Sequence, residues 1–284
     1  MNPIYASRRR RDVIVRALCF VAAAFGVSWL GLILFTLFYN GLAGMSWQLF
    51  TQNTPPPGAS EGGLLNALVG SIIMTVIGVG VGAPIGMFAG TYLAEYGKHD
   101  RLAPVIRFIN DILLSAPSII IGLFVYGAVV VPMGGFSALA GSLALAVIVI
   151  PIVVRTTEDM LSLVPNSLRE AASALGLPRS LVIKRIAYRA ARTGLITGVL
   201  LATARVAGET APLLFTSFNN RFLSTDPRQP ISSLTVQVFT YAISPYEDWH
   251  RQAWAGALVL VAIVFFCSLL ARVATRRLER MRGR

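Results

Sequence analysis

Two charged side chains, Arg205 and Glu209, stand in an otherwise apolar stretch, ATARVAGETAPLLF. Their i, i+4 spacing would put both on one face of a helix, where they can pair. A guanidinium also presents a fork of hydrogen-bond donors that suits an oxyanion. Two interpretations follow: an ion pair that only fixes helix packing, or a polar face on a water-filled path. In the second, Glu209 holds the guanidinium in place or selects an anion that is protonated.

Two neighbours add to this polar face. Thr210 contributes a hydroxyl, so the predicted substrate path comprises Arg205, Glu209 and Thr210. Pro212 has no N–H, which leaves the carbonyl of Gly208 without its helical partner.

The composition indicates what surrounds these residues. Of the 284 residues, 55% are hydrophobic and only 13% are charged, whereas soluble domains carry about 25% charged residues. We therefore expect a polytopic membrane protein built of helices. Counted from Gly194, Arg205 lies about 16 Å along a helix at 1.5 Å per residue, near the middle of a hydrocarbon core about 30 Å thick. A buried charge costs roughly 2.5–3.5 kcal/mol there, which favours a functional role.

The basic residues are distributed unevenly between the predicted spans. Most of the 25 Lys and Arg residues fall in the N-terminal segment, in residues 98–107 and 155–192, and in the C-terminal tail. Outside the spans, only Arg221, Arg228 and Arg251 fall on the other side. Because Lys and Arg gather on the cytoplasmic side of a membrane, the sequence predicts an all-α fold of six transmembrane helices with both termini in the cytoplasm.

The predicted segments follow the apolar runs and the turn-rich stretches between them. They are a basic cytoplasmic N-terminus at 1–16, a first transmembrane helix at 17–39, a periplasmic loop at 40–63, further transmembrane helices at about 64–93, 112–133, 136–154, 194–218 and 253–271, a cytoplasmic loop at 155–193, and a basic cytoplasmic tail at 273–284. Pro84 and Pro117 are expected to kink the second and third helices.

Four glycines recur at every fourth position of the second predicted helix. They are Gly78, Gly82, Gly86 and Gly90. This spacing puts a ridge of glycines along one face, a pattern that lets helices approach closely in lipid. We interpret the ridge as a helix-packing surface.

The basic cytoplasmic loop contains a short polar segment, SLREAASALGLPRS. Ser167 and Glu170 have the S-x-x-E spacing of a helix capping box. Gly176 supplies a left-handed end, and Pro178 blocks continuation of the helix. A helix of about two turns is not stable alone in water, so we expect it to lie against a partner.

The same segment carries the pattern E-A-A-x-x-x-G from Glu170 to Gly176, followed by Ile186. This resembles the EAA loop of ABC importer permeases, whose short helix docks on an ATPase and transmits its motion. The family carries a Leu-Pro after the isoleucine, whereas this chain has Tyr188 and Arg189. The resemblance implies that the ATPase-coupling residues are Ser167, Arg169, Glu170, Ala171, Ala172 and Gly176.

Three further stretches extend the resemblance: ARVAGETAPLLF, SPYEDW and QAWAGALVL. Together with the EAA loop they resemble the phosphate-specific permeases of type I, binding-protein-dependent ABC importers. The resemblance covers about residues 64 to 273. It implies a type I permease core at 64–272, in a multi-pass protein of the bacterial inner (plasma) membrane that forms half of a path for inorganic phosphate.

The resemblance also implies partners. They are a second permease of the PstC type, an ATPase dimer of the PstB type, a periplasmic phosphate-binding protein of the PstS type, and membrane lipid. ATP and Mg²⁺ would be bound by the ATPase, and this chain would bind no cofactor and no metal. It lacks the GxxxxGK[ST] motif that cradles a nucleotide, so it is expected to be a transport subunit and not an enzyme.

The residues leave other functions open. A permease for sulfate or molybdate would share this architecture, and so would the sister phosphate permease of the PstC type. A secondary symporter could also use the Arg205 and Glu209 pair. An intramembrane enzyme is disfavoured, because the sequence shows no HExxH motif and no paired aspartates at membrane depth.

Overall fold

The computed structural model describes residues 3–57, 62–97 and 100–282, with side chains 3–7, 271 and 274–282 excepted. Within these ranges the chain is helical and contains no strand, which confirms the all-α class. The elements are α1 (Pro3–Ala43), α2 (Gln48–Thr51), α3 (Leu65–Glu95), α4 (Leu102–Ser115), α5 (Ser118–Val125), the π-helix η1 (Tyr126–Val130), α6 (Val131–Met133), α7 (Ala138–Ser162), α8 (Asn166–Ala174), α9 (Arg179–Leu181), the π-helix η2 (Val182–Ala187), α10 (Tyr188–Val206), α11 (Ala211–Thr216), α12 (Leu234–Ala242) and α13 (Glu247–Arg282).

Four of the described helices are long and apolar enough to cross a membrane. They are Arg8–Ala43 of α1, α3, α7 and Glu247–Leu270 of α13. The pair formed by α4 and α5–α6 makes a fifth candidate, although it is bent by 105°. The predicted span 194–218 is divided between α10 and α11, so the count of six spans stays a prediction.

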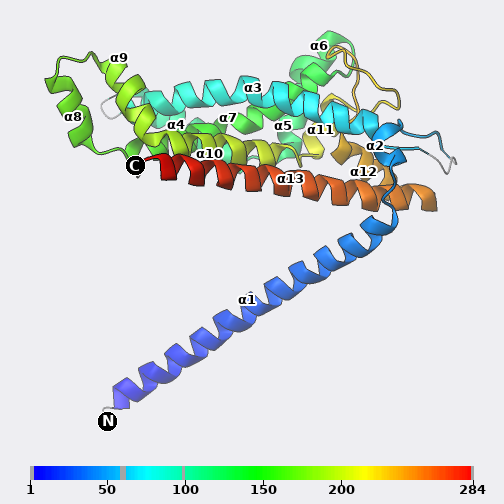
Figure 1. Cartoon of the computed structure of the whole chain (residues 1–284), viewed down its shortest axis with the longest axis horizontal. Helices are drawn as coiled ribbons and strands as arrows, with labels where there is room; N and C mark the ends of the chain where they lie inside the picture. Colours follow the sequence, from blue (N-terminus) through cyan, green and yellow to red (C-terminus); the bar gives the residue numbers. More distant parts are fainter. Residues whose placement is uncertain (1–2, 58–61, 98–99, 283–284) are drawn as a thin grey trace.

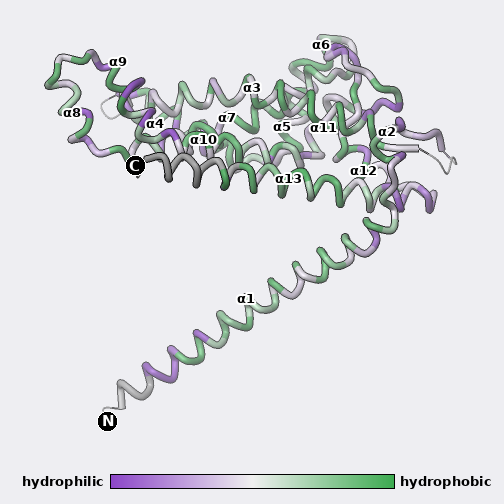
Figure 2. The backbone as a smooth tube through the Cα atoms, viewed as in Figure 1, coloured by the Kyte–Doolittle hydropathy of each residue, from purple (hydrophilic) through white to green (hydrophobic). Residues whose placement is uncertain are grey.

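The long helices run beside one another in a bundle (Figure 1). In this view α3, α7, α10 and α13 share the long axis of the molecule, with α8, α9 and the end of α13 toward one end and α2 and α12 toward the other. The start of α1 points toward the same end as α8, as expected if both termini and the basic loop lie on one side of a membrane. Figure 2 shows hydrophobic residues along α1 after a hydrophilic stretch near its start.

The glycine ridge of α3 lies directly against α7. All four glycines are buried: Gly78, Gly82, Gly86 and Gly90. A Cβ atom at Gly82 would lie 2.9 Å from the carbonyl oxygen of Ala146, and one at Gly86 would lie 2.7 Å from the Cβ of Val153. Only glycine allows the two backbones to come this close. The helix α3 continues through Pro84 without interruption, and the kink predicted there stays a prediction.

The main hydrophobic core packs the short helices α5 and α11 against the long helices of the bundle. It joins α3, α5, α7, α10 and α11 through buried side chains that include Met74, Ile121, Leu145, Ala202 and Leu213. Burial of these apolar groups fixes α5 and α11 against α7.

The polar segments are more helical than the sequence indicated. The fourth predicted helix ends at 154, whereas α7 continues to Ser162, and α10 already begins at Tyr188. The cause is a second buried cluster, in which Leu161 packs with Ala191 and Leu195 and so extends the core past the apolar runs. The stretch 219–252, between the last two predicted helices, likewise contains α12 and the start of α13.

Candidate functional site

The first helix break of the site lies between α4 and α5. Ala116 and Pro117 are extended there, with ψ angles of 132° and 133°, and the flanking helices meet at 105°. A proline disfavours the helical conformation for the residue before it and cannot donate to the preceding turn. The kink predicted at Pro117 is thus confirmed.

The second break separates α10 from α11. Gly208 lies in it, and glycine costs about 1 kcal/mol relative to alanine in a helix interior. Pro212 lies at the start of α11, where its missing N–H is not needed. A Cβ at Gly122 of α5 would lie 2.7 Å from the Cα of Pro212. This close approach holds the second break beside the first.

A cleft of about 230 Å³ opens between the two breaks. Arg205 and Glu209 line it from the second break, and Pro117 and Ser118 line it from the first. The other lining residues are all apolar: Leu113, Leu114, Ala116, Ile121, Ile148, Pro151 and Ile152. Among the described residues that line the cleft, Arg205 is the only base and Glu209 the only acid.

Arg205 and Glu209 share the cleft but not a helix face. Since α10 ends at Val206, Glu209 lies in the break, where its N–H donates to the carbonyl of Val206 at 3.2 Å. In the described part of the chain no ion pair joins the two side chains. The predicted i, i+4 arrangement is therefore wrong, because α10 ends at Val206, between the two residues. Arg205 is an exposed residue.

Thr210 does not line the cleft as Arg205 and Glu209 do. It precedes α11, and its carbonyl accepts the N–H of Leu214 at 3.1 Å; its part in the substrate path stays a prediction. A contact that the sequence did not predict comes from Thr235, whose hydroxyl donates to the carbonyl of Glu209 at 2.8 Å. This bond satisfies a carbonyl that the break leaves without a helical partner.

The helix α8 ends as predicted but begins differently. Gly176 has φ +79°, and the N–H groups of Gly176 and Leu177 donate to the carbonyls of Ser173 and Ala172 at 2.9 and 3.3 Å. This is the paired arrangement of a Schellman motif.

The predicted capping box is wrong. Pro165, with a ψ of 139°, occupies the N-cap position, so α8 begins at Asn166 and Ser167 falls inside its first turn. No side chain caps this end of α8 in the described structure.

The predicted coupling residues divide between two faces of α8. Ser167, Glu170 and Ala171 are exposed, together with Ala174 one turn on. These positions follow the i, i+3, i+4, i+7 spacing of one helix face. Ala172 is buried and Arg169 turns inward, toward the bundle. Gly176 is exposed beyond the end of the helix.

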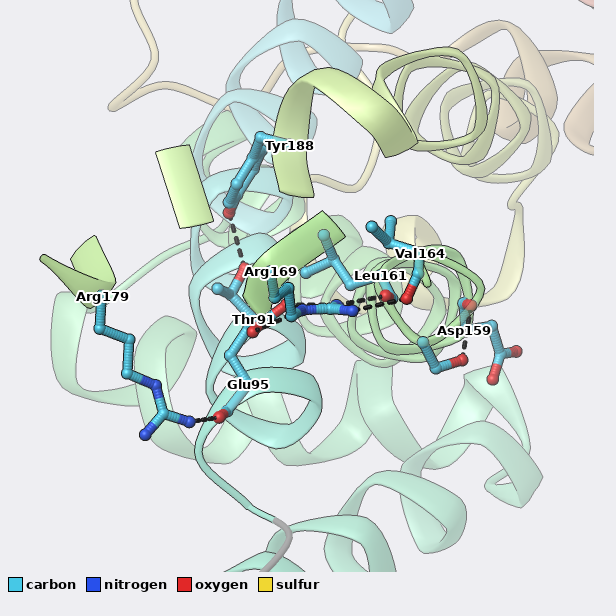
Figure 3. A network of polar contacts seen from close by, with 9 residues as sticks. Thr91, Glu95, Asp159, Leu161, Val164, Arg169, Arg179 and Tyr188 are labelled. Carbon is cyan, nitrogen blue, oxygen red and sulfur yellow. Dashed lines mark hydrogen bonds and ion pairs between the residues drawn. The ribbon is translucent and has the colours of Figure 1, made fainter. Parts of the chain in front are cut away.

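Arg169 makes an ion pair with Glu95 at the end of α3 (Figure 3). Its Nε donates to both carboxylate oxygens, at 3.1 and 3.2 Å, and its Nη2 donates to Oε1 at 2.6 Å. The side chains of Arg169 and Glu95 are 17% and 5% exposed, so the charge of Arg169 is paired inside the protein. This partner could not be predicted from the sequence, because Glu95 precedes Arg169 by 74 residues and has no local motif.

Metal ligands are not grouped in the described ranges. No three His, Cys, Asp or Glu side chains there lie close enough to hold a metal ion. Cys19 and Cys267 are free thiols on α1 and α13. The expectation that this chain binds no cofactor stays a prediction.

The sequence of this chain was compared with protein families and with curated proteins. Residues 82–282 match the family described as the binding-protein-dependent transport system inner membrane component. The chain is 52% identical over 266 residues to the phosphate transport system permease protein PstA of Haemophilus influenzae, covering 94% of each chain. It is also 52% identical over 268 residues to the PstA protein of Yersinia pestis, covering 94% of this chain and 91% of the relative.

A solved structure shares the fold. The inward-facing MetNI methionine ABC transporter matches with a TM-score of 0.61 and 18% identity, over 82% of this chain and 99% of that one. The sequence matches extend over most of the chain, and the bundle with its two broken helices lies within them. The chain belongs to the family of binding-protein-dependent transport system inner membrane components.

Proposed function

We propose that this chain is the membrane-spanning permease subunit of an ATP-driven phosphate importer and forms half of its translocation path. The relatives named PstA support the substrate, since they match nearly the whole chain. The observation that supports binding of an anion is the position of Arg205, the one base among the described residues that line the cleft between the two helix breaks.

Interrupted helices suit a substrate site within a membrane. A break frees backbone groups that a continuous helix would bond internally, and the N-terminal end of a half-helix carries partial positive charge. Ser118, the first residue of α5, lines the cleft together with Arg205. The start of a helix and a guanidinium therefore both favour an anion there.

Glu209 supplies a criterion for which anion enters. Hydrogen phosphate carries a P–OH donor at neutral pH, whereas sulfate does not. A carboxylate accepts a hydrogen bond from the first and repels the second. A site built to bond a particular hydroxyl rejects an analogue that lacks it. Glu209 thus favours a protonated oxyanion.

The exposed face of α8 is the proposed contact with the ATPase. Its residues Ser167, Glu170, Ala171 and Ala174 follow one side of the helix. ATP hydrolysis is carried out by a separate ATPase of the PstB type. A second permease of the PstC type completes the path, and a binding protein of the PstS type delivers phosphate at the periplasmic side of the bacterial inner membrane. Closure of the ATPase moves α8 and switches the access of the cleft.

The experiment is ATP-driven phosphate uptake into liposomes that contain all of these partners. Loss of a charge-assisted hydrogen bond costs roughly 1.5–3 kcal/mol, so Arg205→Ala is expected to lower uptake by about ten- to a hundred-fold. The matched control is Arg221→Ala, which removes an exposed arginine from the loop before α12. Uptake that survives Arg205→Ala at the control level would show that the cleft is not the substrate path.

Two added measurements address the other functions. Competition by sulfate and molybdate tests the substrate, and Glu209→Gln is expected to weaken the rejection of sulfate. Uptake that proceeds without ATP or ATPase would indicate a secondary symporter and would contradict the importer.

A further inference from the structure

The segment that carries α8 is tied to the ends of two long helices. Besides its contacts with Glu95, the guanidinium of Arg169 donates to the carbonyls of Leu161 at 2.8 Å and Val164 at 2.5 Å, at the end of α7. A cation at a helix C-terminus satisfies free carbonyls and offsets the negative end of the helix dipole. The side chain of Arg169 thus caps the end of α7 and also binds the end of α3 (Figure 3).

Arg179, on the other side of α8, binds the same place on α3. Its Nη2 donates to the backbone carbonyl of Glu95, the last residue of α3. Its guanidinium carbon lies 4.4 Å from the centre of the Tyr96 ring, in cation–π geometry. Since Arg169 lies in the first turn of α8 and Arg179 follows its end, the segment is attached to the end of α3 on both sides.

The two attachments converge on Glu95. This residue is only 7% exposed, and its carboxylate accepts three hydrogen bonds from one guanidinium. Removing one partner of a buried ion pair leaves an uncompensated charge, which is strongly unfavourable. The pair therefore forms a specific joint, unlike an exposed ion pair, which contributes little.

We propose that Glu95 is a positioning residue for energy coupling: with Arg169 it forms a joint that makes α8 move with the ends of α3 and α7 as one body. This proposal rests on the proposed function of α8 as the ATPase contact. Without the joint, a displacement of α8 would be absorbed by the non-helical connections 163–165 and 175–178. With it, the displacement passes to the closely packed pair of α3 and α7, and from there to the helix breaks at the cleft.

The first test measures the movement itself. In the assembled transporter, with Cys19 and Cys267 of this chain replaced by alanine, spin labels are placed at two exposed positions outside the proposed ATPase contact, Phe88 on α3 and Leu168 on α8. The distance between the labels is expected to change by less than about 2 Å when ATP binds, the size of a small helix shift. In Glu95→Gln the distribution of this distance should be broader than in the wild type, and its mean should shift when ATP binds. A wild-type distance that changes as much as the variant's would overturn the proposal.

The second test measures phosphate imported per ATP hydrolysed in proteoliposomes. Coupling free energies between sites usually correspond to a factor of about five or more in affinity, and we expect Glu95→Gln to lower the transport ratio on that scale. The matched control is Glu158→Gln on α7, which breaks a more exposed ion pair, 2.8 Å long, with Arg107 of α4 and involves no residue of α8. The control should keep the wild-type ratio. Glu95→Gln with a wild-type ratio would refute the joint.

A further variant covers the case in which Glu95→Gln does not assemble. Arg169→Lys keeps the charge, but an ammonium cannot reach the carboxylate and both carbonyls at once. A lowered ratio with normal ATPase binding supports the joint, and a wild-type ratio contradicts it. Failure of the proposed function would give a different result, because the wild-type complex itself would bind no ATPase or import no phosphate. The proposal for Glu95 would then be refuted as well.

Discussion

The contact between α3 and α7 gives a sharp test of the packing described above. The perturbation is the addition of a single methyl group, by Gly90→Ala. The new Cβ would lie 2.6 Å from the carbonyl oxygen of Val154 and 2.7 Å from the Cβ of Thr157. Both neighbours belong to α7, and the nearer one is backbone, so neither can rotate away.

The magnitude follows from this geometry. Ordinary contacts of a Cβ begin at 3.4 Å, so the helices must separate by roughly 0.8 Å at this point. Overpacking of this kind costs about 1–3 kcal/mol. The gain in helix propensity from glycine to alanine, about 1 kcal/mol, acts in the opposite direction. A control that shares this gain isolates the packing cost.

Gly80 provides that control on the same helix. It is exposed, and a Cβ there would meet nothing within 4 Å. Gly80→Ala should therefore be neutral or stabilising, and the two variants should differ by about 1–3 kcal/mol. At about 2–4 °C per kcal/mol, their thermal midpoints should differ by several degrees. The assay is thermal unfolding of the purified chain in detergent, followed by circular dichroism at one fixed scan rate.

The result that would refute the reasoning is equal stability of Gly90→Ala and Gly80→Ala. It would mean that α3 and α7 do not depend on their close backbone approach. A second comparison, Gly86→Ala, should behave as Gly90→Ala does, because its Cβ would lie 2.7 Å from the Cβ of Val153.

Two further predictions concern the polar ends of the fold. Gly176→Ala should weaken retention of the ATPase on purification, because its φ of +79° costs about 1–2 kcal/mol for a residue with a Cβ; Gly176→Asn, which tolerates this conformation, should be milder, and equal retention by all three chains would contradict the prediction. The N–H of Leu102 donates to the carboxylate of Asp100 and is the main cause that lowers the pKa of Asp100 below 3.8. Because the folded state holds this carboxylate charged, its stabilisation is full above about pH 4 and is lost as the pH falls through the lowered pKa. Thermal midpoints of wild type and Asp100→Asn should therefore converge in acid, and a difference that persists there would contradict the prediction.

The features that local chemistry determines could be predicted from the sequence. The glycine spacing on α3 needs only the helical period, Pro117 enforces its own break, and Gly176 adopts the left-handed conformation that ends α8. The apolar runs likewise indicated the all-helical class. In each case a few neighbouring residues contain all the information.

The failures arise where two local signals compete or where partners are distant. The S-x-x-E spacing at Ser167 indicated a cap, but Pro165 takes the cap position and the helix starts at Asn166. The spacing of Arg205 and Glu209 indicated one helix face, but α10 ends at Val206, between them. The partners of Glu95 and of Thr235 could not be predicted, since they depend on packing between elements far apart in the chain.

The first helix has a consequence for the lipid around the protein. The stretch Arg8–Ala43 buries nothing against the rest of the chain over its most apolar part, and it meets α13 only near its end, where a Cβ at Gly41 would lie 2.8 Å from the Cβ of Leu258. At 1.5 Å per residue its 36 residues extend about 54 Å, against a hydrocarbon core of about 30 Å. The helix must therefore slant or protrude, and Figure 1 shows it diverging from the bundle. In a bilayer, lipid acyl chains would fill the space between the diverging helix α1 and the rest of the bundle. The membrane area spanned by the isolated chain therefore includes lipid as well as protein.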